Sequence, residues 1–311
     1  MLLYHRKPND PAPLSQPDPY IFKDNDQYFI YTTGGEGAHL YTSKRLKEGW
    51  KYHGVCLEMP GQMNCWAPAV IKIDDIYYMY YSSILTTDPD EHSQRLRLAV
   101  SDTPEGPFIY QQDLLEPFSI DPHAVMTPSG LYLFYSINDL ESERAGTYIV
   151  CDRMVNPTLP EGRPAAVVRP SLSQELYMKD RFKPGQDWYT LEGAFYFYKN
   201  GTHYVMYSGA NHTDPSYFVG YATAQGPEDA DLRDLLWKKQ PSDSEFAPVL
   251  YTNDAIEGMG HNSMIFDQGK YWIVYHGRKV GDLEKYREDS RMVRIDELKV
   301  EGDLLEAEVT E

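Results

Sequence analysis

Five residues that could carry chemistry stand at matching places along the chain. Each lies ten to twelve residues ahead of a short run rich in tyrosine, and in order they are Asp18, Trp66, Asp121, Glu192 and His261. Carboxylates that converge shift each other's pKa values, so one can stay protonated as an acid while another stays ionised as a base. Three carboxylates with a tryptophan and a histidine therefore predict acid–base catalysis, provided that the fold brings them together.

Each of these residues also has an ordinary structural explanation when it is taken alone. Asp-Pro occurs five times in the chain, and most such pairs only mark turns. Glu192 precedes a glycine, which is a common context, and a lone histidine or tryptophan is more often a core residue than a catalyst. The position shared across five repeats favours a joint functional site, because converging carboxylates cost stability.

The elements that must position these residues are strands. Tyrosine-rich runs recur at intervals of roughly 50 to 70 residues, at 27–31, 77–81, 131–135, 203–207 and 271–275. Several follow a turn signal, as the second arm of a hairpin does. The interval fits four strands per unit, which is the blade period of a β-propeller, whose first strands line a central channel. We therefore predict an all-β, five-bladed β-propeller that forms a single domain over residues 1–311.

Two other features of the pattern bear on the fold. Helical periodicity is scarce, and one short helix is expected over 229–237, where a proline and acidic residues precede it. A β-sandwich is the alternative architecture, but a sandwich rarely carries so regular a repeat.

The charge of the chain narrows the classes of partner. Of its 311 residues, 29 are Lys or Arg and 47 are Asp or Glu, which gives a formal net charge of −18. Nucleic acids and anionic membranes bind basic patches, so neither is expected as a partner, whereas a neutral substrate or a cation is admitted. No apolar run approaches the ~20 residues of a membrane helix.

Cysteine usage and the first residues point to a compartment. Cys56, Cys65 and Cys151 have no metal-ligand spacing and are expected to be buried free thiols. The N-terminal segment lacks the apolar core of a signal peptide, which predicts a cytoplasmic protein. The sequence does not set the oligomeric state.

The motifs around the five residues resemble those of glycoside hydrolase family 43, five-bladed propellers that cleave arabinofuranosides and xylosides. The resemblance runs from about residue 16 to about residue 305. The matching motifs are Asp18-Pro19-Tyr20, Trp66-Ala67-Pro68, Ile120-Asp121-Pro122, Glu192-Gly193, Gly260-His261-Asn262-Ser263 and the stretch 291–298. Ala69 replaces an acid of the family pattern and Ala194 replaces a proline, at positions that carry none of the proposed chemistry.

The resemblance implies a role for each carboxylate. Asp18 would be the general base that activates water, Asp121 would modulate pKa, and Glu192 would be the general acid that protonates the leaving oxygen. Family members invert the anomeric carbon, which requires base and acid carboxylates about 6.5–9.5 Å apart. A raised pKa of Glu192 is expected, from burial and from the neighbouring charge of Asp121.

The resemblance also implies residues around the sugar. Trp66 would form an apolar wall, Arg291 would contact substrate hydroxyls or the Asp121 carboxylate, and His276 and Arg278 would lie at the rim. No cofactor is required for the chemistry. A structural calcium or sodium ion in the channel is expected near His261, held through water because hard cations prefer oxygen ligands.

The expected function is that of an exo-acting α-L-arabinofuranosidase that takes short arabino-oligosaccharides, within hemicellulose degradation. The chain leaves no room for the C-terminal β-sandwich that xylosidases of the family usually carry, which favours arabinose. A β-D-xylosidase, or one enzyme acting on arabino- and xylo-oligosaccharides, is the main alternative, and an endo-arabinanase is less favoured. A non-catalytic sugar-binding propeller and a protein-interaction propeller are the alternatives outside catalysis. The polar loops 83–94 and 177–189 are expected to shape the pocket.

Overall fold

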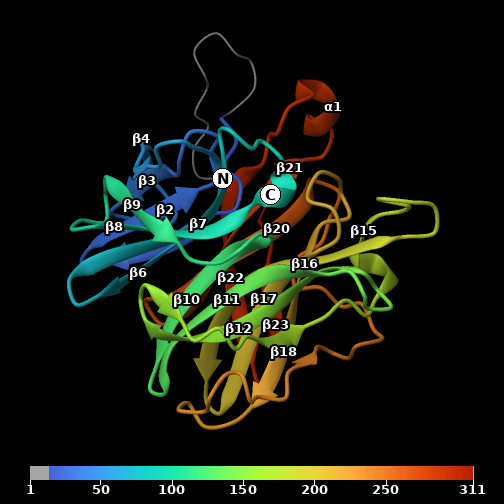
Figure 1. Ribbon diagram of the computed structural model, residues 1–311. Helices are drawn as coiled ribbons and strands as arrows, with labels where there is room; N and C mark the ends of the chain where they lie inside the picture. The colour runs from blue at the N-terminus through green and yellow to red at the C-terminus, as the bar shows by residue number, and fades with distance from the viewer. Residues whose placement is uncertain (1–13, 311) are drawn as a thin grey trace.

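The computed structural model describes residues 14–310, and strands dominate them (Figure 1). Helix is confined to α1 (Asp282–Tyr286) and two 3-10 turns, η1 (Glu91–Ser93) and η2 (Ser173–Glu175), within these residues. The helix expected over 229–237 is wrong. Turns occupy this segment, and the Arg233 backbone and guanidinium both donate to Asp231. A side chain that binds the backbone two residues on in this way competes with helix formation.

The first two sheets follow the chain, with antiparallel pairs apart from one short parallel pair. The first contains β1 (Tyr20–Asp24), β2 (Gln27–Thr32), β3 (His39–Ser43) and β4 (Lys51–Val55). The second contains β5 (Leu57–Glu58), β6 (Gln62–Ile73), β7 (Ile76–Leu85), β8 (Arg95–Ser101) and β9 (Phe108–Asp113), with β5 paired to the outer edge of β9.

The third sheet has ten strands in two parts. Its first part is β10 (Ser119–Thr127), β11 (Gly130–Asp139) and β12 (Gly146–Asn156), with β13 (Leu159–Pro160) and β14 (Ala165–Val168) on β12. Its second part is β16 (Trp188–Lys199), β17 (Thr202–Gly209), β18 (Phe218–Gln225) and β19 (Lys238–Lys239), with β15 (Leu176–Met178) on β16. Two parallel residue pairs between β12 and β16 join the parts. This join depends on Gly146, since a Cβ there would lie 1.8 Å from the Tyr189 carbonyl oxygen.

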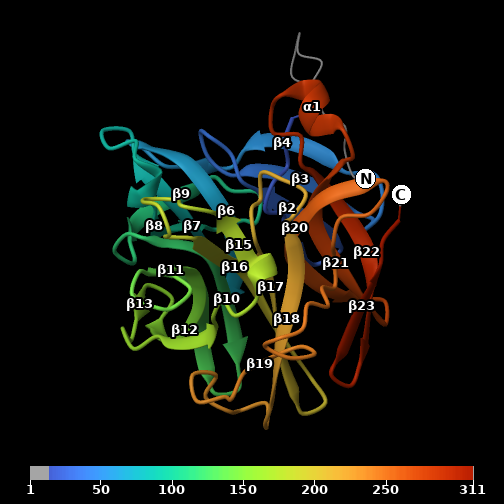
Figure 2. The ribbon, with the colours of Figure 1, turned by 90° about the vertical axis from the view of Figure 1, so that its right-hand side faces the viewer.

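The fourth sheet returns to the first one. It contains β20 (Ile256–Asp267), β21 (Lys270–Lys279), β22 (Met292–Glu301) and β23 (Leu304–Glu308). The strands β1, β6, β10, β16 and β20 contact one another in a closed cycle, in which β20 meets β1. In Figure 2 the red C-terminal strands accordingly lie beside the blue N-terminal ones. The Ile21 backbone N–H donates to the Ser263 hydroxyl across this seam.

The expectation that each tyrosine-rich run is the second arm of a hairpin is confirmed. The five runs fall on β2, β7, β11, β17 and β21, each paired antiparallel with the strand before it. Three of the turns carry two successive residues with positive φ, as type I′ hairpins require: Asp74–Asp75, Asn200–Gly201 and Gln268–Gly269. Buried rings and aliphatic side chains of these runs then pack between neighbouring sheets.

Each strand of the closed cycle has a left-handed residue, on it or just ahead of it, at or next to a residue that lines the pocket described below. These residues are Asp18 (φ 55°), Ala67 (45°), Asp121 (57°), Gly193 (63°) and His261 (45°). Register shifts in β6, β10, β16 and β20 fall at the same places. By backbone position, Ala67 and Gly193 are therefore the counterparts of Asp18, and Trp66 and Glu192 stand one residue earlier. Counting to the tyrosine run could not detect this offset, because a bulge adds a residue without changing residue types.

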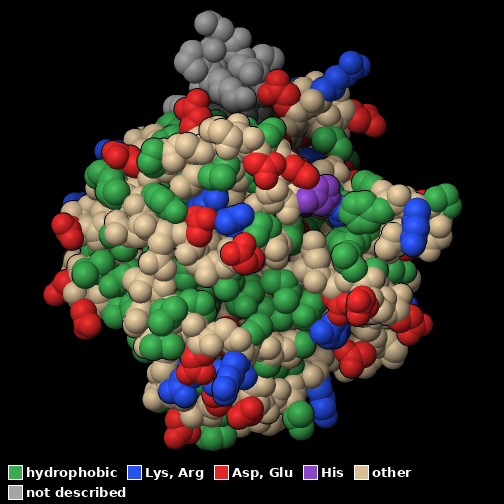
Figure 3. All heavy atoms as spheres, in the orientation of Figure 1, with side chains coloured by type: hydrophobic (Ala, Val, Ile, Leu, Met, Phe, Trp, Pro, Cys, Tyr) green, Lys and Arg blue, Asp and Glu red, His purple; other side chains and the backbone are tan. Residues whose placement is uncertain are grey.

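Surface charge and the state of the three cysteines can be compared with the expectations from the sequence. Acidic and basic side chains are interspersed over the face in Figure 3. Cys56, Cys65 and Cys151 are free and buried, as expected. No helix among residues 14–310 is long and apolar enough to cross a bilayer.

Candidate active site

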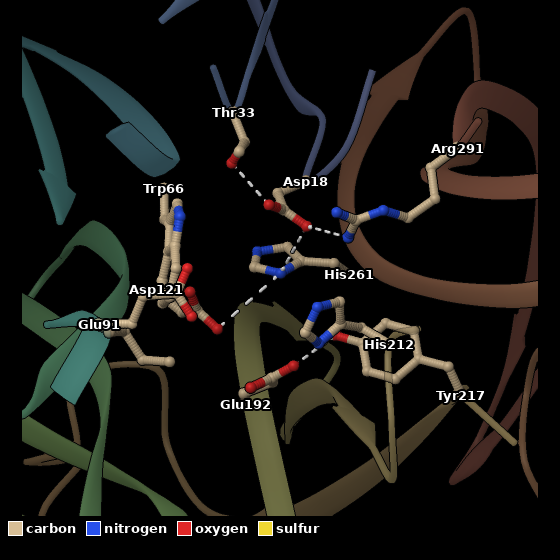
Figure 4. Close-up of a pocket in the computed structure, with 11 residues that line it drawn as sticks. Asp18, Thr33, Trp66, Glu91, Asp121, Glu192, His212, Tyr217, His261 and Arg291 are labelled. Carbon is tan, nitrogen blue, oxygen red and sulfur yellow. Dashed lines mark hydrogen bonds and ion pairs between the residues drawn. The ribbon is translucent and has the colours of Figure 1, made fainter. Parts of the chain in front are cut away.

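A pocket of about 240 Å³ opens where the strands of the cycle begin (Figure 4). Its lining includes six residues singled out from the sequence: Asp18, Trp66, Asp121, Glu192, His261 and Arg291. Thr33, Glu91, Ile120, His212 and Tyr217 complete it. The strands of the cycle thus bring together residues that lie up to 273 positions apart in the chain, from 18 to 291.

Asp18 lies just before β1 and is surrounded by donors and a cation. Its Oδ2 accepts a hydrogen bond of 2.6 Å from the Thr33 hydroxyl. Its Oδ1 is 3.6 Å from the Arg291 guanidinium and 3.4 Å from His261 Nδ1. In Figure 4 these groups surround one carboxylate at the pocket wall. A carboxylate held this way can accept a proton from a bound water.

Asp121 is the most deeply buried of the four acidic residues that line the pocket. Its Oδ2 accepts a hydrogen bond of 3.1 Å from the Gly193 backbone N–H. Burial, and then the charges of Glu192 and Asp18, raise the pKa of Asp121 well above its usual range. Gly193 permits this contact because it is left-handed, and a Cβ there would lie 3.1 Å from His261 Nδ1.

Glu192 on β16 is suited to carry a proton. Burial, with the charge of Asp18 adding to it, raises the pKa of Glu192 to about 7, against a hydrogen bond from Tyr217 and the charge of Arg291. The Tyr217 hydroxyl donates to Oε1 at 2.8 Å. Asp121 interacts with the same carboxyl, since the charge of Glu192 raises the pKa of Asp121. Near neutral pH, Glu192 can hold a proton and release it to a leaving group.

Arg291 is held in place from behind. Asp289 accepts hydrogen bonds from its Nε at 2.9 Å and from its outer nitrogen at 2.7 Å. The carboxylate it faces in the pocket is that of Asp18. A fixed planar guanidinium has donors left for substrate hydroxyls.

His276 and Arg278 do not lie at the rim, which corrects the expectation for both. His276 is completely buried behind Asp18, and its Nδ1 accepts the Asp18 backbone N–H at 3.0 Å. Arg278 is 3% exposed and donates to Glu257 at 3.0 Å. Both residues lie near the end of β21, where a strand can reach the rim of a pocket. Neighbouring segments cover both side chains there, so neither one lines the pocket.

Three lining residues were missed from the sequence. Thr33 follows β2, and His212 and Tyr217 lie in the connection 210–217 between β17 and β18. Burial, and then the charge of Arg291, lower the pKa of His212 to about 4, so it is neutral at ordinary pH. Connection length was the only signal for His212 and Tyr217, because neither belongs to the repeated motif.

The two polar loops meet beside the pocket. Glu91 of the loop 83–94 lines the pocket. The neighbouring His92 ring is 5.9 Å from the Phe182 ring of the loop 177–189. Arg181 of the second loop lies over the Trp188 ring, and its charge acts on Glu192. The first loop therefore forms part of the wall, and the second packs against it.

The channel ion can be tested against the donors present. Within residues 14–310, no group of three or more His, Cys, Asp or Glu side chains is placed to hold a metal ion. His261 Nδ1 faces carboxylates, at 3.4 Å from Asp18 and 3.9 Å from Asp121. An ion beside His261 fits only if water supplies most of its ligands, as expected for a hard cation held through water.

The fold and the site define an all-β protein with a pocket lined by acidic residues. Comparison with known proteins identifies its family. A solved thermostable family-43 glycoside hydrolase superposes with a TM-score of 0.78 at 26% identity, covering 95% of this chain and 93% of that one. The family model for glycosyl hydrolases family 43 matches residues 10–303. The chain belongs to this family and is a glycoside hydrolase.

Curated relatives carry several activities in their names. The chain is 28% identical over 250 residues to "Alpha-L-arabinofuranosidase B" of Pyricularia oryzae, covering 75% of this chain and 47% of that protein. It is 25% identical over 293 residues to "Extracellular exo-alpha-(1->5)-L-arabinofuranosidase" of Streptomyces avermitilis, covering 88% and 57%. The chain thus spans about half the length of these relatives. Arabinan endo-arabinosidases and a xylosidase/arabinosidase are among the other relatives.

Proposed function

We propose that this protein is an inverting exo-glycosidase that releases terminal α-L-arabinofuranose from arabino-oligosaccharides. The observation that carries the proposal is the unequal environment of two carboxylates in one pocket. Glu192 has a pKa of about 7, while Asp18 faces a guanidinium and a hydroxyl donor. Two titratable groups whose environments differ in this way are suited to separate acid and base roles.

The chemistry follows from these environments. Asp18 takes a proton from a water molecule, whose oxygen attacks the anomeric carbon and inverts it. Glu192 gives its proton to the departing glycosidic oxygen, so the bond breaks without a free alkoxide. Asp121 orients the site through the Gly193 backbone and, with its raised pKa, limits repulsion among the three carboxyl groups.

The pocket suits one sugar at a chain end. Its volume of about 240 Å³ is below the ~300–1,000 Å³ of pockets that take drug-sized ligands. Trp66 offers an apolar wall, and Arg291 offers donors to sugar hydroxyls. Exo action on arabinofuranose is also the activity in the name of the Streptomyces relative. A β-D-xylosidase or a dual enzyme is the second candidate, favoured by the Humicola insolens relative named "Xylosidase/arabinosidase 43A".

The scaffold we propose for this site is a five-bladed β-propeller. The closed cycle of five strands, each with a left-handed residue at or next to a pocket-lining residue, supports this architecture. The ten-stranded sheet would then hold two blades joined by the two parallel pairs between β12 and β16. We also propose a calcium or sodium ion beside His261, with water as its main ligand.

Hydrolysis of two chromogenic glycosides tests the function. The wild type should cleave the aryl α-L-arabinofuranoside faster than the aryl β-D-xylopyranoside, and proton NMR should detect the β-anomer of arabinose first. Glu192→Ala should lose arabino-oligosaccharide hydrolysis but retain part of its rate on an activated aryl leaving group. Asp18→Ala should lose both, while Glu284→Ala on α1 should behave as wild type.

Each other outcome has a distinct meaning. A preference for the xyloside would keep the mechanism and overturn the substrate. The α-anomer as first product would overturn inversion. No turnover of either glycoside by the wild type would favour a non-catalytic sugar-binding protein.

A further inference from the structure

Two hydroxyl side chains, one just after β2 and one on β17, accept hydrogen bonds from the backbone of a neighbouring strand of the closed cycle. The Ala67 N–H donates to Thr33 Oγ1 at 2.8 Å, and the His261 N–H donates to Ser208 Oγ at 2.6 Å. In both contacts the donor is a left-handed residue of the closed cycle. Each hydroxyl thus fixes a strained, left-handed backbone position that is at or next to a residue of the pocket.

His276 makes the corresponding contact at the seam between the last sheet and the first. It pairs with Gly260, as Ser208 pairs with Glu192, so the two side chains occupy matching places on β21 and β17. The Asp18 N–H donates to His276 Nδ1, which must therefore be unprotonated. Burial, and then the charge of Arg291, hold the pKa of His276 well below its usual range. An imidazole thus replaces the hydroxyl at the contact with the backbone of the proposed base.

Tyr217 joins this contact to the proposed acid. Its ring is parallel to the His276 ring, with an interplanar angle of 4° and a centroid distance of 5.7 Å. The ring also covers Gly260, where a Cβ would lie 2.0 Å from it. Its hydroxyl donates to Glu192 at 2.8 Å, and Figure 4 shows it directed at that carboxylate.

We propose that Tyr217 and His276 are positioning residues, a stacked pair that sets where Glu192 lies relative to Asp18. The proposal rests on the proposed function, in which these carboxylates are acid and base. An inverting reaction needs them at a fixed separation, and a 1 Å misplacement can cost about 100-fold in rate. Both rings are buried, so neither has to contact the substrate for this role.

Tyr217→Phe tests the acid side, because it keeps the stacked ring and removes only the hydroxyl. We expect kcat on arabino-oligosaccharides to fall about 10- to 100-fold, kcat on an activated aryl arabinofuranoside to fall far less, and KM to stay unchanged. The basic limb of the pH–rate profile should move to higher pH, since the lost hydrogen bond favoured the charged form of Glu192. The titratable or charged groups that act on or face Glu192 are Tyr217, Tyr177, Asp18, Asp121, Arg181 and Arg291.

Tyr28→Phe is the matched control for this variant. Tyr28 is also buried and donates to a carboxylate, Asp267, at 2.8 Å, but at a hairpin away from the pocket. It should leave the ratio of the two rates unchanged. A Tyr217→Phe enzyme with the wild-type rate ratio and pH profile would overturn the role of Tyr217.

His276 is tested by a pair of variants that differ in one acceptor. His276→Gln keeps an oxygen that can accept the Asp18 N–H, and His276→Leu does not. We expect His276→Leu to lower kcat on both substrates by the same factor, about 100-fold, with KM unchanged, and His276→Gln to recover most of it. Equal rates for the two variants at equal melting temperature would overturn the role of His276.

Failure of the proposed function gives a different result. If the wild type cleaves neither glycoside, or if Glu192→Ala keeps full activity on arabino-oligosaccharides, the acid–base assignment fails and the positioning proposal falls with it. If the wild type and Glu192→Ala behave as proposed and only the Tyr217 and His276 variants do not, the positioning proposal alone is wrong.

Discussion

Replacement of Glu192 by glutamine should make the folded protein more stable above neutral pH. Burial raises the pKa of this carboxyl to about 7 in the folded protein, from an ordinary value of 4.5. The folded protein therefore binds the proton more tightly than the unfolded chain, and the free energy of unfolding falls as pH rises from 4.5 to 7. At 1.36 kcal/mol per pH unit, the full loss is about 3.4 kcal/mol above pH 7.

Glutamine removes this cost, because it is neutral and nearly the same shape. Its amide oxygen can still accept the Tyr217 hydroxyl that now binds Glu192 Oε1. The same two pKa values give a gain of about 1 kcal/mol at pH 5 and about 3 kcal/mol at pH 8. The unfolding entropy of ~2.1 cal/mol/K per residue amounts to about 0.65 kcal/mol/K for this chain, so the melting temperature should rise by about 1 °C and 5 °C.

Melting curves of the wild type and Glu192→Gln at pH 5 and pH 8 are the assay. Glu284→Gln, which removes an exposed carboxylate on α1, is the control and should change neither temperature. An equal gain at both pH values would mean that the shape of the side chain, not its charge, causes the effect. A Glu192→Gln protein no more stable than the wild type at pH 8 would refute a raised pKa at this site.

Two further predictions concern the floor of the pocket. Gly260→Ala should destabilise the protein by about 1–3 kcal/mol, measured by urea unfolding, and should lower kcat, because the added Cβ would overlap the Tyr217 ring. Gly35→Ala, where the added Cβ would meet nothing within 4 Å, is its control, and a silent Gly260→Ala would contradict the packing. Removal of divalent ions with EDTA should lower the melting temperature of the wild type but not of His261→Ala, and added calcium should restore it; a wild type that does not respond to EDTA would contradict a calcium ion at this site.

The strands could be predicted from the sequence because their signal is local. Tyrosine-rich runs after turn residues gave the second arm of all five hairpins, and burial of the three thiols followed from residue type and spacing. The short helix over 229–237 failed for another reason. Leu232 of this segment is buried in the core, yet the Asp231 carboxylate accepts the Arg233 backbone N–H and so favours a turn over a helix.

The pocket could be predicted only as far as the repeat extends. Six lining residues follow from the recurring motif and from the family resemblance. His212 and Tyr217 come from a connection that lies outside the repeat. His276 lies behind Asp18 because the last sheet contacts the first one there. Such contacts depend on how sheets close on each other, which the spacing of residue types does not encode. Inversion, the channel ion and the cytoplasmic location stay predictions.

The site concentrates costs that the rest of the molecule must offset. Four non-glycine residues at the pocket floor are left-handed, and each such position costs about 1–2 kcal/mol. The buried proton of Glu192 adds about 3 kcal/mol above neutral pH. These terms together match or exceed a typical net stability of 5–15 kcal/mol at its lower end, so packing between the sheets has to offset them.

Contacts between the first and last sheets both stabilise the fold and surround the proposed base. Asp18 comes from the first sheet, yet His276, Arg291 and His261, which surround it, all come from the last sheet or from the segment within it. The Ser263 hydroxyl, which donates to the Pro19 carbonyl at 2.7 Å, ties the same two sheets together. A chain that lost the contact between its first and last sheets would therefore keep all three carboxylates and still lack the surroundings that let Asp18 act as a base.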